Sequence, residues 1–137
     1  MAARTKARKA ALDLLFEADQ RGVNVAELLS QRLAVPVGQA PVRDYTATLV
    51  RGVVDHWVEI NDLITTWAQG WTLDRMPAVD RAILRLGTFE VGYAADVPES
   101  VAISEWVGLA TELSTDESPK FVNGLLARIA EIKPTLV

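Results

Sequence analysis

Residues 80–126 read DRAILRLGTFEVGYAADVPESVAISEWVGLATELSTDESPKFVNGLL, and this stretch decides the fold of the chain. Apolar side chains recur along it at steps of three and four, which is the period of an amphipathic α-helix and not of a strand. The spacing predicts helices over 78–93 and 98–113, with Pro98 as a first helical residue, and a last helix that starts at Ser118. The helix over 98–113 is apolar around most of its girth, so we expect it to be central and buried.

The remainder of the chain has the same helical spacing and no clean alternating run typical of a strand. We expect a first helix over 4–20 that stops at Gly22, and a second that Asn24 caps and that runs through Leu33. The next predicted elements are a loop over 35–41, a long helix over 42–67 and a short helical piece within 69–77. The long helix carries a predicted buried stripe of Leu49, Val53, Trp57, Ile60 and Ile64. The chain is therefore predicted to be all-α, with six or seven helices in one domain over residues 1–137.

Composition limits the possible classes of protein. Half of the 137 residues are apolar and 23% are charged, which is ordinary for a soluble globular chain. The absence of cysteine excludes disulfides, thiolate zinc sites and a cysteine nucleophile, and it is compatible with a reducing cytoplasm. No apolar stretch approaches the roughly 18 residues of a membrane span. We expect a soluble, cytoplasmic protein without a membrane segment.

Charge is distributed unevenly along the chain. The stretch RTKARKAALDLLF, residues 4–16, begins with Arg4, Lys6, Arg8 and Lys9 before the first acid. The whole chain has a formal charge of −4, so a basic end precedes a strongly acidic body. Such a segment can be a disordered tail, a targeting sequence or a helix end that meets an anion. Because it runs directly into helical apolar spacing, we favour the helix end and a local anionic partner.

Motifs for catalysis or metal binding are scarce. The glycines form neither GxGxxG nor GxxxxGK[ST], there is no GxSxG, and His56 is the only histidine. Asp55, Glu59 and Asp62 share a helix face beside it, a spacing that suits either carboxylate ligands of a metal or a solvated acidic surface. We expect the solvated surface, no metal, no cofactor and no enzymatic activity.

Three features carry candidate binding residues, each with a structural alternative. SPKFVNGLL, residues 118–126, gathers Lys120, Phe121 and Asn123 at a helix start, which suits a phosphate and a stacked base or else simple capping and core packing. The four tryptophans suit an aromatic platform or core filling. The charges within 79–90 suit an ion-pair network, with Glu105 as a partner for an arginine, or a protein-binding surface that includes Phe89.

The stretch over residues 80–126, together with ARKAALDLLFEAD at residues 7–19, resembles the NusB family of bacterial transcription antitermination factors. The motifs DRAILR, the VP corner, VAI.E and KFVNG.L occur in the order and spacing of that family, and the resemblance covers nearly the whole chain. It implies two small helical subdomains packed at a steep angle, and no catalysis. It also implies binding of the boxA segment of ribosomal RNA leader transcripts together with NusE, a small-subunit ribosomal protein. NusA, NusG and RNA polymerase complete the implied assembly, which suppresses premature rho-dependent termination during ribosomal RNA synthesis.

The resemblance also implies roles for particular residues. The RNA-binding set that it implies is Arg4, Lys6, Arg8, Lys9, Phe16, Lys120, Phe121 and Asn123. The NusE-binding set is Asp80, Phe89, Glu90 and Glu105. The basic arm, about residues 1–9, is short, so we expect it to need both the second patch and NusE. The alternative function is a helical protein–protein adaptor in which the arm only solvates the N-terminus.

Overall fold

The computed structural model describes residues 2–36, 38 and 40–133, and within them the chain is helical without a strand. The α-helices are α1 (Ala3–Arg21), α2 (Val25–Ala34), α3 (Asp44–Asp55), α4 (Trp57–Trp67), α5 (Ala78–Gly92), α6 (Glu99–Leu113) and α7 (Ser118–Ile132), with a 3-10 turn η1 (Leu73–Arg75). The predicted all-α class is confirmed, as is the short helical piece before α5. Residues 37 and 39 of the predicted loop lie outside the described part of the chain.

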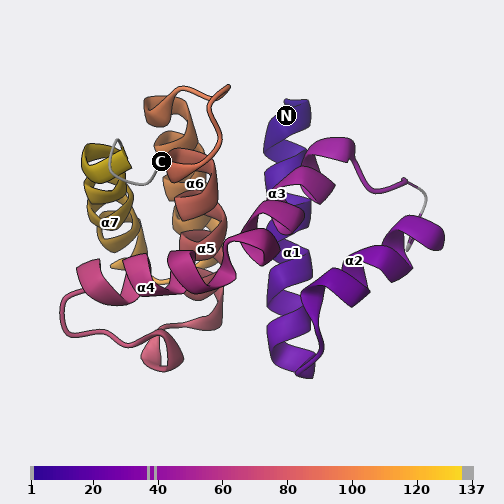
Figure 1. The fold of residues 1–137 in the computed structure, drawn as a ribbon, viewed down its shortest axis with the longest axis horizontal. Coiled ribbons are helices and arrows are strands. Elements are labelled where there is room, and N and C mark those ends of the chain that lie inside the picture. Colours follow the sequence, from indigo (N-terminus) through magenta and orange to yellow (C-terminus); the bar gives the residue numbers. More distant parts are fainter. Residues whose placement is uncertain (1, 37, 39, 134–137) are drawn as a thin grey trace.

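The helices form two groups that meet on α5 (Figure 1). One group is α1 to α3, and the other is α4 to α7. Helix α5 packs on α1 and α3 as well as on α4, α6 and α7, so it belongs to the contacts of both groups. A residue at almost any angular position of α5 is therefore buried.

The expectation that the helix over 98–113 is the central one is wrong. Helix α6 packs mainly on α5 and α7, and it buries a single face that includes Ala102 and Trp106. Val101 and Leu113 on its other side are 47% and 38% exposed. The apolar sequence of residues 98–113 therefore predicted the helix correctly but not its position. Helix α5 is the central helix, because it contacts five other helices.

Local signals at the ends of α1 and α2 act as predicted. Gly22 follows α1 with φ 67°, a left-handed conformation that glycine adopts without a steric penalty, and its N–H bonds back to the last turn. The side chain of Asn24 accepts hydrogen bonds from the N–H groups of Ala26 at 2.9 Å and Glu27 at 3.2 Å. The turn between the two helices is therefore specified by two neighbouring residues.

The predicted long helix over 42–67 is two helices, α3 and α4, separated at His56. His56 leaves helical geometry, with φ −114° and ψ 26°, and its ring stacks on Tyr93 at 4.2 Å between centroids. The change of direction takes α4 from the first group to the second. It also leaves Trp57, predicted to be buried, 40% exposed at the start of α4.

Candidate nucleic-acid interface

The predicted basic arm is the first part of α1. The side chain of Arg4 is 49% exposed, pairs with Asp96 at 3.3 Å and lies over the ring of Tyr45 at 4.3 Å from its centroid. Lys6 is exposed and has no ion pair with any residue that the structure describes. Lys9 pairs with Asp13 at 3.0 Å, one helical turn away. Arg4, Lys6 and Lys9 therefore offer cationic groups at the surface.

Arg8 lies in the interior instead, which does not fit its predicted role as a phosphate contact. Its side chain is 3% exposed, and its Nε donates to both carboxylate oxygens of Glu90, at 2.9 and 3.1 Å. A terminal nitrogen donates to Glu105 at 2.9 Å. The sequence did contain a signal for this placement, because Arg8 shares a helix face with the buried residues Leu12 and Leu15.

Glu90 is the centre of a buried polar cluster. Its fully buried carboxylate accepts hydrogen bonds from Arg8, from the indole N–H of Trp106 at 3.0 Å and from the hydroxyl of Tyr45. Burial raises the pKa of Tyr45, and the hydrogen bond to Glu90 raises it further. This cluster joins α1, α3, α5 and α6, so its main effect is to fix the arm relative to the rest of the molecule.

The structure does not bring the four predicted partner-binding residues together on one surface. Asp80 is buried at the start of α5, where it accepts hydrogen bonds from Ser114 at 2.6 Å and Ser118 at 2.9 Å. Phe89 is half-buried, Glu90 is fully buried, and Glu105 is partly exposed with its side chain at 31%. Glu90 and Arg81 on α5 therefore form ion pairs, as the structural alternative expected, whereas Asp80 bonds to serines; the arginine that pairs with Glu105 comes from α1.

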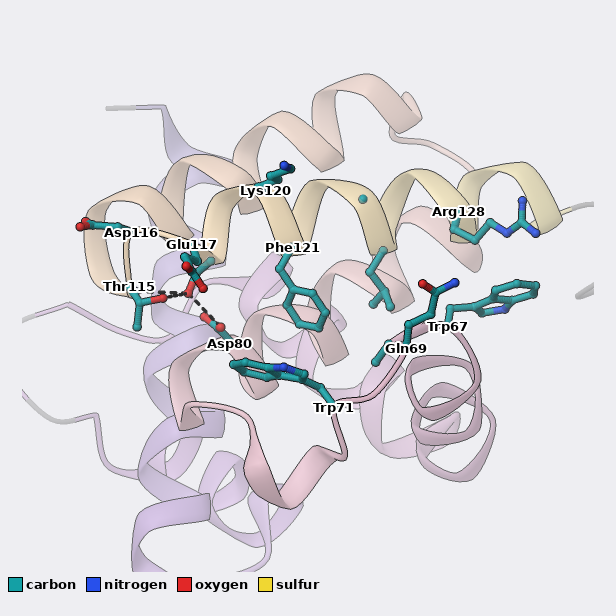
Figure 2. A pocket seen from close by; sticks show the side chains of 14 residues that line it. Trp67, Gln69, Trp71, Asp80, Thr115, Asp116, Glu117, Lys120, Phe121 and Arg128 are labelled. Carbon is teal, nitrogen blue, oxygen red and sulfur yellow. Dashed lines mark hydrogen bonds between the residues drawn. The ribbon is translucent and has the colours of Figure 1, made fainter.

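The second predicted patch lies at the start of α7, beside a groove of about 840 Å³. Figure 2 shows the ring of Phe121 projecting from α7 toward Trp71, and the two centroids are 5.5 Å apart at an interplanar angle of 42°. Lys120 and Asn123 are exposed on the same helix, and Trp71 is 46% exposed. The structure therefore adds Trp71 to the predicted residues, and WAQGW, residues 67–71, was the signal for it.

Further along the groove, Trp67 lies beneath Arg128, whose guanidinium carbon is 4.4 Å from the ring centroid (Figure 2). Asp116 and Glu117 line the opposite end. The groove thus has aromatic walls, the cations Lys120 and Arg128 on α7, and two acids at the end away from Arg128. Partly exposed aromatic rings and cations of this kind suit unpaired bases and their phosphates.

The two patches lie toward opposite ends of α5. The arm is anchored at Glu90 and the start of α7 at Asp80, and ten residues of helix span about 15 Å. Helix α1 runs antiparallel to α5, because Arg8 pairs with Glu90 while Asp19 pairs with Arg81 at 2.6 Å. The exposed Phe16 therefore lies between the arm and the second patch, on the helix face that also carries Lys6 and Lys9.

No group of three or more metal-ligating side chains occurs in the described part of the chain. Asp55, Glu59 and Asp62 are exposed on α3 and α4, and the ring of His56 faces Tyr93. None of the described helices is long and apolar enough to cross a bilayer.

Comparison with known proteins agrees with this architecture. The profile of the NusB family matches residues 5–131. The chain is 60% identical to the transcription antitermination protein NusB of Kineococcus radiotolerans over 136 residues, which is 99% of this chain and 98% of that protein. The chain therefore belongs to the NusB family of transcription antitermination proteins.

Solved structures show the same fold. NusB of T. maritima superposes with a TM-score of 0.82 at 32% identity, over 95% of this chain and 92% of that one. A second structure, of the antitermination factors NusB and NusE in complex with dsRNA, superposes with a TM-score of 0.78 at 29% identity, over 93% of this chain and 96% of that one. The expected NusB-like fold is thus confirmed.

Proposed function

We propose that this protein suppresses premature, rho-dependent termination by binding boxA RNA of ribosomal RNA leader transcripts together with NusE. The similarity to NusB in the complex of NusB and NusE with dsRNA, over 93% of the chain, is the observation that carries the proposal. The assembly also includes NusA, NusG and RNA polymerase, and the protein acts in the cytoplasm as a binding factor and not as an enzyme. Residues 1–137 act as one RNA-binding domain.

The RNA follows α1 toward the start of α7. Arg4, Lys6 and Lys9 neutralise phosphates, and Phe16 lies on the path between the two patches. The second patch contributes Lys120 for a phosphate, Asn123 for hydrogen bonds and the Phe121–Trp71 pair for stacked bases. Since stacking on a side chain needs unpaired bases, the boxA strand binds single-stranded, and it must extend from one patch to the other, whose anchors lie about 15 Å apart along α5.

Arg8 supports this site by positioning α1 and not by contacting RNA. Because it is bound to Glu90 and Glu105, it sets the position of α1 and therefore of Lys6 and Lys9 on either side of it. In the predicted NusE-binding set, Glu105 and the half-buried Phe89 offer atoms to a partner, whereas the buried Asp80 and Glu90 position the helices that carry them.

A titration against boxA RNA and a scrambled RNA, with and without NusE, tests the proposal. Replacing both Lys6 and Lys9 by alanine should weaken boxA binding and lower the salt slope by about 1.4, since each phosphate contact to single-stranded RNA contributes about 0.7. The matched control replaces Arg51 and Arg75, two exposed arginines outside both patches, and should leave the slope unchanged. An unchanged slope in the Lys6/Lys9 variant contradicts the assignment of the arm.

Phe121→Leu tests the second patch separately. Loss of one stacked base should cost about 1–3 kcal/mol of binding free energy at every salt concentration, with the slope unaltered. Equal affinity of Phe121→Leu and the unchanged protein would remove the groove from the RNA path.

One observation favours the alternative of a protein–protein adaptor. Of the four basic residues in the arm, Arg8 is buried and Arg4 and Lys9 are already paired with acids. The same titration separates the two functions. Binding of NusE without any retention of boxA RNA, in the free protein and in the complex, would establish the adaptor.

A further inference from the structure

A second pocket, of about 450 Å³, lies between α1, α3, α4 and α5, away from both patches described above. Its walls are largely apolar and include Leu15, Val25 and Val54. Val23 and Trp57 lie at its edge, 41% and 40% exposed. The volume falls within the range of about 300–1,000 Å³ that is typical of ligand pockets.

Arg85 on α5 is the cation of this pocket. Its Nε donates to Asn61 at 3.0 Å, and its guanidinium lies over Trp57 at 4.4 Å from the ring centroid. These two contacts fix the planar group in place. Among the described residues, none places a carboxylate within 4.0 Å of the Arg85 guanidinium, and none offers an acceptor to its two terminal nitrogens. Burial lowers the pKa of Arg85.

The acid that lines this pocket, Asp19, is already paired. The carboxylate of Asp19 accepts a hydrogen bond from Arg81 at 2.6 Å, and Arg81 also donates to two carbonyl groups before α5. Asp19, Arg81 and Arg85 together therefore carry one net positive charge. A carboxylate can form a bidentate pair with a guanidinium and so supply the missing partner, whereas a phosphate chain carries several charges, which one net positive charge and apolar walls suit less well.

We propose that this pocket binds a segment of a protein partner in which an acidic residue lies next to a bulky apolar residue. The carboxylate pairs with Arg85, and the apolar side chain packs against Trp57 and Val54. Charge complementarity carries the proposal, since the pocket presents a positioned guanidinium without a carboxylate partner. The inference goes beyond the proposed function and does not depend on the RNA path or on NusE.

The test uses N-acetyl-Asp-Leu-amide as the probe and nitrogen-15 NMR of the full chain. The indole signal of Trp57 and the Nε–H signal of Arg85 should shift, with a dissociation constant of about 1–10 mM for so small a ligand. N-acetyl-Asn-Leu-amide should bind at least about tenfold more weakly, because it lacks the charge. N-acetyl-Asp-Gly-amide should also bind more weakly, because it lacks the apolar side chain.

Protein variants give the complementary comparison. Arg85→Gln should weaken the binding of the Asp-Leu probe by about tenfold or more, and Arg51→Gln, on an exposed face of α3, should not change it. If Arg85→Gln does not fold, the comparison of the Asp and Asn probes on the unchanged protein still decides. Absence of shifts with the Asp-Leu probe, or equal binding of the Asn-Leu probe, overturns the proposal. Larger shifts of the same signals with inorganic phosphate or oligouridine also overturn it and indicate a nucleic-acid contact.

Discussion

Replacing Glu90 by glutamine tests whether the buried cluster holds α1 in place. The side chains of Arg8 and Glu90 are 3% and 0% exposed, so water screens their interaction very little. The substitution removes the negative charge and leaves the guanidinium of Arg8 inside the protein. It also turns one carboxylate oxygen into an amide N–H₂, which faces the guanidinium of Arg8 and either the indole N–H of Trp106, a donor only, or the hydroxyl of Tyr45, which would have to turn and accept.

Breaking one partner of such a buried pair costs about 3–5 kcal/mol of unfolding free energy. Arg8 keeps its contact with Glu105, whose side chain is 31% exposed, so we expect the low end, about 3 kcal/mol. For a chain of this length the loss corresponds to a decrease in Tm of about 10 °C. Urea unfolding followed by tryptophan fluorescence measures it, because Trp106 is buried beside the substituted group.

Glu131→Gln is the matched control. Glu131 pairs with Arg128 at 2.8 Å, but its side chain is 64% exposed, so its loss should change the unfolding free energy by less than about 0.5 kcal/mol. A cost below about 1 kcal/mol for Glu90→Gln would refute the reasoning, since it would mean that the cluster is either solvated or replaceable without strain.

Three further predictions concern packing, capping and pH. Gly52→Ala places a Cβ against the ring of Phe89, which must move, and should destabilise the protein by about 1–3 kcal/mol in urea unfolding, whereas Gly108→Ala, with no atom in its way, should not. Asn24→Ala removes the cap of α2 and should cost about 1 kcal/mol, with Asn24→Ser recovering most of it; an unchanged midpoint would exclude a capping role. Burial raises the pKa of Tyr45 above that of an unfolded tyrosine, about 10, so the stability from this group is present below pH 10 and lost at higher pH. Unfolding measured between about pH 9 and 11 should therefore show a steeper loss for the unchanged protein than for Tyr45→Phe.

Helical spacing and short capping signals predicted most of the fold. The last three helices begin, and the first two of them end, within a few residues of the predicted bounds, because their apolar periods and the breaks between them are local properties of the sequence. Gly22 and Asn24 also act within one turn of their own positions. The family resemblance added the grouping of the helices, which no local signal contains.

The errors arose where distant contacts override local preference. The helical period continues through His56, but the ring of His56 stacks on Tyr93, far along the chain, and the helix breaks there. Similarly, the apolar sequence of α6 does not say which helix has neighbours on all sides. Such information is carried by packing between segments and not by the period of any one of them.

The candidate site was predicted in part for the same reason. The surface positions of Lys6, Lys120 and Asn123 follow from helix faces that the sequence already shows. The burial of Arg8 depends on acids located on two other helices, and a run of basic residues does not distinguish a paired arginine from a free one. The roles of all these residues in binding RNA stay predictions.

The cluster around Arg8 also has a consequence for the order in which the molecule is assembled during synthesis. Arg8 is separated from Glu90 by 82 residues and from Glu105 by 97. Helix α1 leaves the ribosome first, but its charged anchor has no partner until α5 and α6 have followed. A chain stopped before residue 90 could still pack α1 on α2 and α3, with Thr46 bonded to the carbonyl of Ala7, but the charge of Arg8 would stay without a carboxylate partner.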